Sequence, residues 1–162
     1  MAKNVSTVAA LLLAAVLPAA AGGPAELPPV LGATELFARH DRSGVGLSGF
    51  DPVSYFAGEP RPGRADLELV WAGLAWRFSS AANREAFRRD PVVYAPRLGA
   101  YDAAAAADGR LVEADPTRFA LVAGRLYLFR DAAGQRRFVA EPALAAAAEK
   151  RWPDLSRELV KP

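Results

Sequence analysis

The sequence predicts an α+β fold, in which two units, each a β-hairpin followed by a helix, form a small antiparallel sheet with helices packed against it. Two segments, 67–78 and 119–129, alternate apolar and polar residues around an Ala-Gly turn, which is typical of β-hairpins. A helix-forming segment that ends near an acid-proline pair follows each hairpin. The chain has 162 residues, of which 52% are hydrophobic, enough to build the core of one domain of ordinary size.

Residues 1–21 have the pattern of a secretory signal peptide. A basic residue near the start precedes an apolar run over 8–17, and small residues at 19–21 form an A-x-A-like cleavage site. The apolar run is too short to span a bilayer comfortably. We therefore expect cleavage, a periplasmic or secreted protein, and no transmembrane helix in the mature chain; the alternative is a segment kept as an anchor. Residues 22–33, rich in Pro and Gly, are predicted to link the signal peptide to a single domain over 34–162.

The first half of the domain is predicted to contain a helix, a hairpin and a second helix. A short helix over 34–42 begins at its threonine, which is a good N-cap, and a glycine-rich segment ends it. Ala72-Gly73 forms the turn of the hairpin. Ser79 or Ser80 then caps a helix over 81–90, which the following proline ends because proline disfavours helical geometry in the residue before it.

The second half is predicted to begin with an alanine-rich helix that starts near Asp102 and ends at Asp108-Gly109. Its hairpin turns at Ala123-Gly124. The tail is a strong helix former with Pro142 in its first turn, and Trp152-Pro153 separates this helix from a short terminal one.

The two hairpins form an internal near-repeat. The segments "AGLAWRF" and "AGRLYLF" share Ala-Gly, an aromatic residue and a Phe; a second Phe and an acid-proline pair follow at matched distances. All matched positions are offset by 51 residues, which favours an internal repeat of residues 67–96 as 118–147. The strands of the two units could share one antiparallel sheet.

The composition excludes several classes of function. The sequence has no cysteine, so thiol chemistry and thiolate metal sites are ruled out. A net charge of +2 without a clustered basic face argues against nucleic acid as a partner. The one histidine, His40, cannot build a zinc site without several carboxylates, and the serines near it carry no further sign of a nucleophile-base pair. We expect no catalytic residues and no cofactor, with a bound metal ion as the alternative.

Three blocks of the sequence resemble the exported YHS-domain proteins of bacteria: "LSGFDPVSYFAGEPRPG", "WRFSSAANREAFRRDPVVYAPRLGAYDAA" and "DPTRFALVAGRLYLF". They follow the family's order over about half of the chain. Smaller YHS modules carry three cysteines that are suspected metal ligands, and these positions fall on Ser54, Ser79 and Asn83. Hydroxyl and amide oxygens are poor ligands for zinc or copper. The exported branch keeps a cysteine or selenocysteine at the position matched by Asp102.

Asp102 is the main candidate for a site residue. One interpretation is structural, because its carboxylate can cap the alanine-rich helix. The other is a carboxylate that faces a pocket with Tyr101, Tyr55 and Asp51 and binds a cation or a hydrogen-bond donor. Asp51 is also explained as a turn residue. Tyr55, Tyr94 and Tyr101 are explained as core or rim aromatics, although together they could line a small cleft.

These observations predict a non-enzymatic, exported, YHS-type binding or accessory module, whose partner is an unidentified small ligand or an envelope protein. The alternative is a divergent metal-handling or redox-family protein that binds a cation through oxygen ligands near Asp102.

Overall fold

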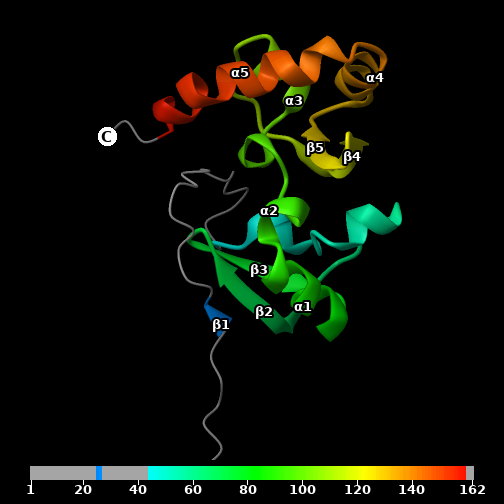
Figure 1. Cartoon of the computed structure of the whole chain (residues 1–162), viewed down its shortest axis with the longest axis vertical. Coiled ribbons are helices and arrows are strands. Elements are labelled where there is room, and N and C mark those ends of the chain that lie inside the picture. Colours follow the sequence, from blue (N-terminus) through cyan, green and yellow to red (C-terminus); the bar gives the residue numbers. More distant parts are fainter. Residues whose placement is uncertain (1–24, 27–43, 160–162) are drawn as a thin grey trace, which may run out of the picture.

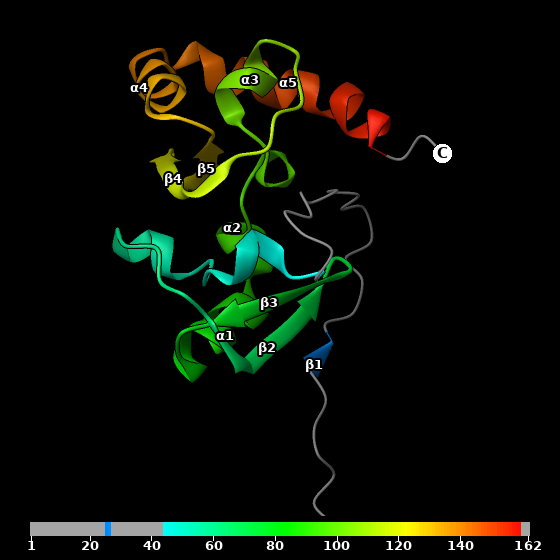
Figure 2. The same cartoon turned by 180° about the vertical axis from the view of Figure 1, so that it is seen from behind.

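The computed structural model of the chain describes residues 25–26 and 44–159. The predicted signal peptide, the helix predicted over 34–42, His40 and all but two residues of the predicted linker lie outside the described residues. Within the described part the α+β class is confirmed (Figures 1 and 2). The elements of the first unit are β1 (Ala25–Glu26), η1 (Gly46–Gly49), η2 (Ser54–Ala57), β2 (Arg64–Trp71), β3 (Leu74–Phe78), α1 (Ala81–Arg89) and α2 (Pro91–Tyr94). Those of the second unit are η3 (Leu98–Ala100), α3 (Ala103–Ala107), β4 (Asp115–Val122), β5 (Arg125–Phe129), α4 (Ala132–Ala140) and α5 (Ala143–Glu158).

The first unit is built on the hairpin of β2 and β3. Its turn is Ala72-Gly73, as predicted, and both residues have positive φ, which suits the right-handed twist of the strands. Ser80 caps α1 by accepting a hydrogen bond from the backbone N–H of Asn83 at 3.1 Å. Alternate residues of β3 are buried against α1, so the hairpin and the helix enclose an aromatic core of Trp71, Trp76, Phe78 and Phe87.

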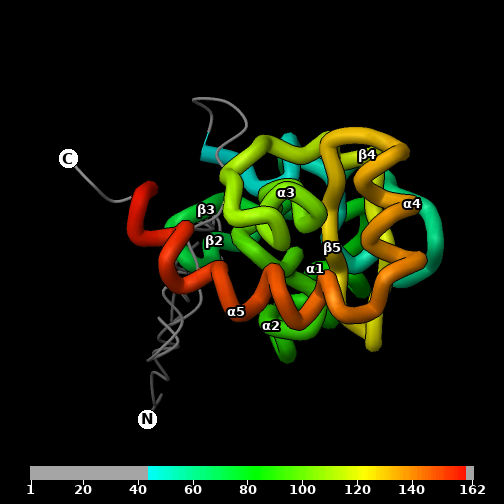
Figure 3. Tube along the Cα trace, turned by 90° about the horizontal axis from the view of Figure 1, so that it is seen from above, coloured from blue at the N-terminus to red at the C-terminus, as the bar shows by residue number. Residues whose placement is uncertain are grey.

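The second unit repeats this plan and adds helices. Asp131 caps α4 by accepting from the N–H of Gly134 at 2.8 Å. All five alanines of α3 are buried, and α4 and α5 pack around this short helix (Figure 3). The alanines therefore serve close packing between helices as well as helix formation.

The C-terminal helix differs from the prediction, because α5 continues through Pro153 to Glu158 without a break. A proline inside a helix removes one backbone hydrogen bond. Trp152 and Leu155, on either side of it, are both buried in the core of the second unit. Their burial requires the helical path on both sides of the proline, so tertiary packing keeps the helix whole. None of the described helices has the length and apolar character that crossing a bilayer requires.

The prediction that both hairpins could share one sheet is wrong. The strand β1 pairs with β2 in a three-stranded sheet, whereas β4 and β5 form a sheet of their own. The two units meet through side chains instead. Leu126 and Leu128 of β5 belong to the same buried cluster as the aromatic residues of the first unit, and the ring of Tyr55 packs edge-on against Phe119. Side-chain burial thus joins the units where strand pairing was expected.

The offset of 51 residues recurs throughout the structure. The bounds of β2, β3 and α1 match those of β4, β5 and α4 residue for residue after this shift, and so does the register of the two hairpins. The match also extends upstream of the predicted repeat. Residues 47–49 and 98–100 share positive φ angles, and the N–H groups of Asp51 and Asp102 donate to equivalent carbonyls, both at 2.8 Å. The structural repeat therefore begins at Leu47 and Leu98, well before residues 67 and 118.

Candidate functional site

Asp102 is a buried carboxylate that joins two elements. Its side chain is 5% exposed. Oδ1 accepts a hydrogen bond from the backbone N–H of Ala105 at 2.9 Å, which is the predicted cap of α3. Oδ2 accepts from the backbone N–H of Arg130 at 2.8 Å, directly after β5. The cap interpretation is confirmed, and the same carboxylate also fixes the junction between β5 and α4.

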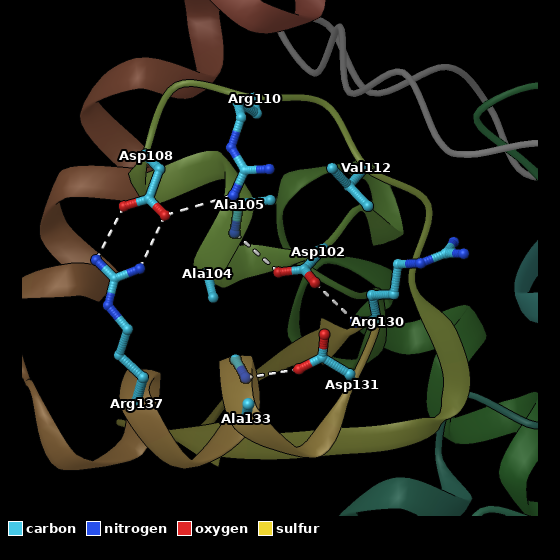
Figure 4. A pocket seen from close by; sticks show the side chains of 11 residues that line it. Asp102, Ala104, Ala105, Asp108, Arg110, Val112, Arg130, Asp131, Ala133 and Arg137 are labelled. Carbon is cyan, nitrogen blue, oxygen red and sulfur yellow. Dashed lines mark hydrogen bonds and ion pairs between the residues drawn. The ribbon is translucent and has the colours of Figure 1, made fainter.

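A cavity of about 330 Å³ lies beside this carboxylate, between α3 and the start of α4 (Figure 4). It is lined on one side by Asp102, which is buried, and by Asp131 and Gly134 at the start of α4. On its other side Arg137 donates two hydrogen bonds to Asp108, at 2.8 and 2.9 Å, and Arg110 lies 3.6 Å from the same carboxylate. The cavity is therefore lined by a buried carboxylate, that of Asp102, and by exposed acids, one of which, Asp108, is already ion-paired.

Two of the acids that line the cavity, Asp108 and Asp131, have a lowered pKa. The hydrogen bonds from the Arg137 guanidinium hold the pKa of Asp108 below its usual value. The backbone N–H of Gly134 does the same for the pKa of Asp131. Near neutral pH these two side chains are thus carboxylates, which accept hydrogen bonds and do not donate them.

Asp51 is the counterpart of Asp102 in the first unit, since the two positions differ by the repeat offset of 51 residues. Asp51 is fully buried, and its Oδ1 accepts from the N–H of Val53 at 2.9 Å. Its Oδ2 accepts three hydrogen bonds: from the N–H of Ser79 at 2.9 Å, from the Ser79 hydroxyl at 2.6 Å and from the Asn83 amide at 2.6 Å. This carboxylate is fully engaged inside the protein.

The second unit lacks two of these donors. Arg130 stands at the position of Ser79 and supplies its backbone N–H alone, while Gly134 stands at the position of Asn83 and has no side chain. Oδ2 of Asp102 therefore accepts one hydrogen bond where Oδ2 of Asp51 accepts three. Asp102 and Gly134 both line the cavity, and a Cβ built on Gly134 would stand 3.9 Å from that less engaged oxygen.

Ser54, Ser79 and Asn83 gather around Asp51. Besides the donors Ser79 and Asn83, Ser54 donates from its hydroxyl to the Asp51 carbonyl at 2.6 Å. Shifted by 51 residues, the same three positions are Ala105, Arg130 and Gly134, which all line the cavity of the second unit. The cavity thus lies in the second unit at the place that Ser54, Ser79 and Asn83 fill in the first.

The predicted tyrosines do not line this cavity. The hydroxyl of Tyr55 donates to the carbonyl of Pro116 at 2.7 Å, and burial raises the pKa of this phenol. Tyr94 packs edge-on against Phe56, and the ring of Tyr101 lies at a tilt of 40° against that of Trp152, with the ring centroids 5.9 Å apart. Asp51 does not line it either. Of the five predicted binding residues, Asp102 is the one placed at the cavity.

No family model, curated protein or solved structure matches the chain.

Among the residues that line the cavity, the sequence did not single out Arg130, Asp131 and Gly134. The 51-residue offset was the signal that could have found them, because it pairs Asp51 with Asp102 and Asn83 with Gly134. Across residues 25–26 and 44–159, no three His, Asp or Glu side chains come together in an arrangement that could hold a metal ion.

Proposed function

We propose that this chain is a non-enzymatic, exported binding module of the YHS type, which holds a small ligand in the cavity beside Asp102. The observation that supports this proposal is the state of Asp102 Oδ2. It belongs to a buried side chain, borders a cavity of about 330 Å³, and accepts one backbone hydrogen bond. A carboxylate oxygen has room for at least two donors, so a bound ligand would complete its hydrogen bonding.

The kind of group around the cavity favours binding over catalysis. Its lining supplies carboxylates, guanidinium groups, backbone N–H groups and alanine methyl groups. Within the described part of the chain its lining includes no hydroxyl, thiol or imidazole, and each of its three carboxylates already accepts hydrogen bonds from backbone N–H groups or from Arg137. Export is supported by the signal-peptide pattern of residues 1–21.

The resemblance to the exported YHS proteins supports the choice of site. In that branch a thiol or selenol stands at the position of Asp102. In the present chain the cavity lies next to Asp102. An aspartate keeps a negative charge there and loses the redox chemistry. We therefore propose that this chain still binds a ligand at the position of Asp102 and that it has lost the redox chemistry of the thiol or selenol.

A fragment screen by NMR tests this function. The ¹⁵N-labelled protein is titrated with a library of small neutral, cationic and anionic compounds, and with calcium, zinc and copper salts. The reporters are the N–H signals of Ala105 and Arg130, which donate to Asp102. We expect at least one compound to shift both signals in the wild type and not in Asp102→Asn.

Asp66→Asn is the matched control. Asp66 is an exposed carboxylate on β2 that pairs with Arg64, so its replacement removes one charge away from the cavity. Binding that survives in Asp66→Asn and disappears in Asp102→Asn supports the proposal. The proposal is contradicted if no compound shifts the two N–H signals, or if a compound binds as strongly to Asp102→Asn as to the wild type. A metal ion as the one binder would support the cation-binding alternative instead.

A further inference from the structure

We infer that the ligand of this cavity is a small molecule with a primary amide or primary amine group, whose N–H donors take the place that the Asn83 amide has in the first unit. This inference rests on the proposed binding function and adds to it the chemical class of the ligand.

The first unit contains the template for such an interaction. The Asn83 side-chain nitrogen lies 2.6 Å from Asp51 Oδ2 and 3.3 Å from the Ser79 hydroxyl oxygen. One nitrogen with two hydrogens thus satisfies the acid and a neighbouring oxygen at once. Asn83 reaches the acid from the first turn of α1, three residues after the cap Ser80.

Gly134 has the same place in α4, three residues after the cap Asp131, and leaves the space open. A Cβ built on Gly134 would stand 3.9 Å from Asp102 Oδ2, 3.6 Å from Asp131 Oδ1 and 3.3 Å from the Ala104 methyl carbon. No ligand atom can occupy that position itself, which is one bond from the Gly134 Cα, but a ligand atom beyond it, where an asparagine side chain would extend, would approach the same two carboxylate oxygens and the Ala104 methyl group. In Figure 4 the side chain of Asp131, at the start of α4, lies directly below that of Asp102.

Two carboxylate oxygens near one point favour a nitrogen with at least two hydrogens over a hydroxyl group, because a hydroxyl has a single hydrogen to donate. They also disfavour a ligand that places a carboxylate there. The cationic side chains nearby do not fill this role. Arg137 is engaged with Asp108, and the Arg130 side chain extends away from Asp102 in Figure 4.

The cavity has room for a small ligand. A volume of about 330 Å³ corresponds to about ten water molecules at roughly 30 Å³ each. The alanine side chains of α3 and α4 provide an apolar wall, so a short carbon chain or ring behind the nitrogen would contact Ala104 and Ala133.

The test compares probes that differ only in their N–H groups. Acetamide and methylammonium are the donors, while N,N-dimethylacetamide and tetramethylammonium keep the neutral or charged group without any N–H. Sodium acetate tests for anion binding. The N–H signals of Arg130 and Ala105 are followed in the ¹⁵N-labelled protein. We expect saturable shifts with a donor probe and affinities about tenfold or more weaker for its methylated partner.

Gly134→Asn provides the decisive variant, because it returns the amide of the first unit to the second. We expect this variant to lose the response to the donor probes, and its Arg130 N–H signal to move in the free protein as the new amide reaches Asp102. Gly134→Ala controls for the change in helix propensity. Should Gly134→Asn fold poorly, Asn83→Gly gives the reciprocal test: it opens the equivalent space beside Asp51, and donor probes should then shift the N–H signals of Ser79 and Val53.

The outcomes separate the ligand class from the binding function. Equal shifts with the methylated probes, or shifts with acetate alone, overturn the ligand class. A donor response that persists unchanged in Gly134→Asn overturns it as well. If the donor probes shift nothing while the fragment screen still finds a binder that depends on Asp102, the ligand class is wrong and the binding function stands. If neither finds a binder, both are wrong.

Discussion

Replacing Asp51 by alanine should destabilise the protein more than the same replacement of Asp102, although the two acids hold equivalent positions in the repeat. Asp51→Ala removes the acceptor for four hydrogen bonds, and Asp102→Ala removes the acceptor for two. Both carboxylates are buried, so the donors left behind lose their partner without gaining full access to water.

The magnitudes follow from these hydrogen bonds. Taking about 1.5 kcal/mol for each hydrogen bond to a charged group, Asp51→Ala costs about 6 kcal/mol and Asp102→Ala about 3 kcal/mol of the free energy of unfolding. A domain of this size has a total stability of roughly 5–15 kcal/mol. Asp102→Ala should therefore remain folded, while Asp51→Ala lies close to the limit of stability.

Equilibrium unfolding in urea, followed by tryptophan fluorescence, measures both values. Trp71 and Trp76 report on the first unit and Trp152 on the second. If Asp51→Ala gives no folded protein, Asp51→Asn and Asp102→Asn allow the same comparison, because each asparagine keeps one acceptor oxygen. Equal losses for the two positions, or a larger loss at Asp102, would refute the conclusion that Asp102 is the less engaged carboxylate.

Three further measurements test other contacts. Tyr55→Phe removes the hydroxyl that donates to a β4 carbonyl at 2.7 Å, so we expect a loss of about 1 kcal/mol in urea unfolding; an unchanged midpoint would contradict this link between the units. Gly63→Ala would place a Cβ 2.4 Å from the backbone carbonyl carbon of Arg77. We expect the free energy of unfolding to fall by about 2 kcal/mol, and an unchanged value would show that the close packing of these two backbones does not require glycine. Burial, and then the hydrogen bond to Glu149, raise the pKa of Tyr127 from 10.0 to about 12. The neutral phenol thus stabilises the fold below pH 10, and this contribution is lost as the pH rises towards 12. The urea midpoint should fall as the pH rises over that range, and it should fall less in Tyr127→Phe. An equal dependence of the midpoint on pH in the two proteins would contradict the raised pKa of Tyr127.

The hairpins and most helices could be predicted because their determinants are local. Alternating apolar residues around Ala72-Gly73 and Ala123-Gly124 determine the strands and their turns, and Ser80 and Asp102 cap the helices that follow them in the chain. Each of these signals acts within a few residues. The α+β class follows from them.

The separate sheets and the unbroken α5 could not be predicted in this way. Whether β4 pairs with the first hairpin depends on how the units pack, and the burial of Leu126 and Leu128 against the first unit favours side-chain contact. Pro153 would end an isolated helix, but the burial of Trp152 and Leu155 keeps the chain helical on both sides of it.

The match between Asp51 and Asp102 was present in the sequence but weak. Upstream of the hairpins, the shift of 51 residues aligns few identical residues, among them Leu47 with Leu98 and Gly58 with Gly109. The shared backbone angles and hydrogen bonds make the match clear in the structure.

The sequence by itself determined the local elements, their caps and turns, the absence of thiol chemistry, and Asp102 as the residue of interest. Only the tertiary structure decided what that residue can do. The hydrogen-bond capacity of a buried carboxylate is filled or left open by residues far along the chain. Ser79 and Asn83 complete Asp51 from 28 and 32 positions away, and the residues equivalent to them, Arg130 and Gly134, leave Asp102 with an acceptor that borders a cavity.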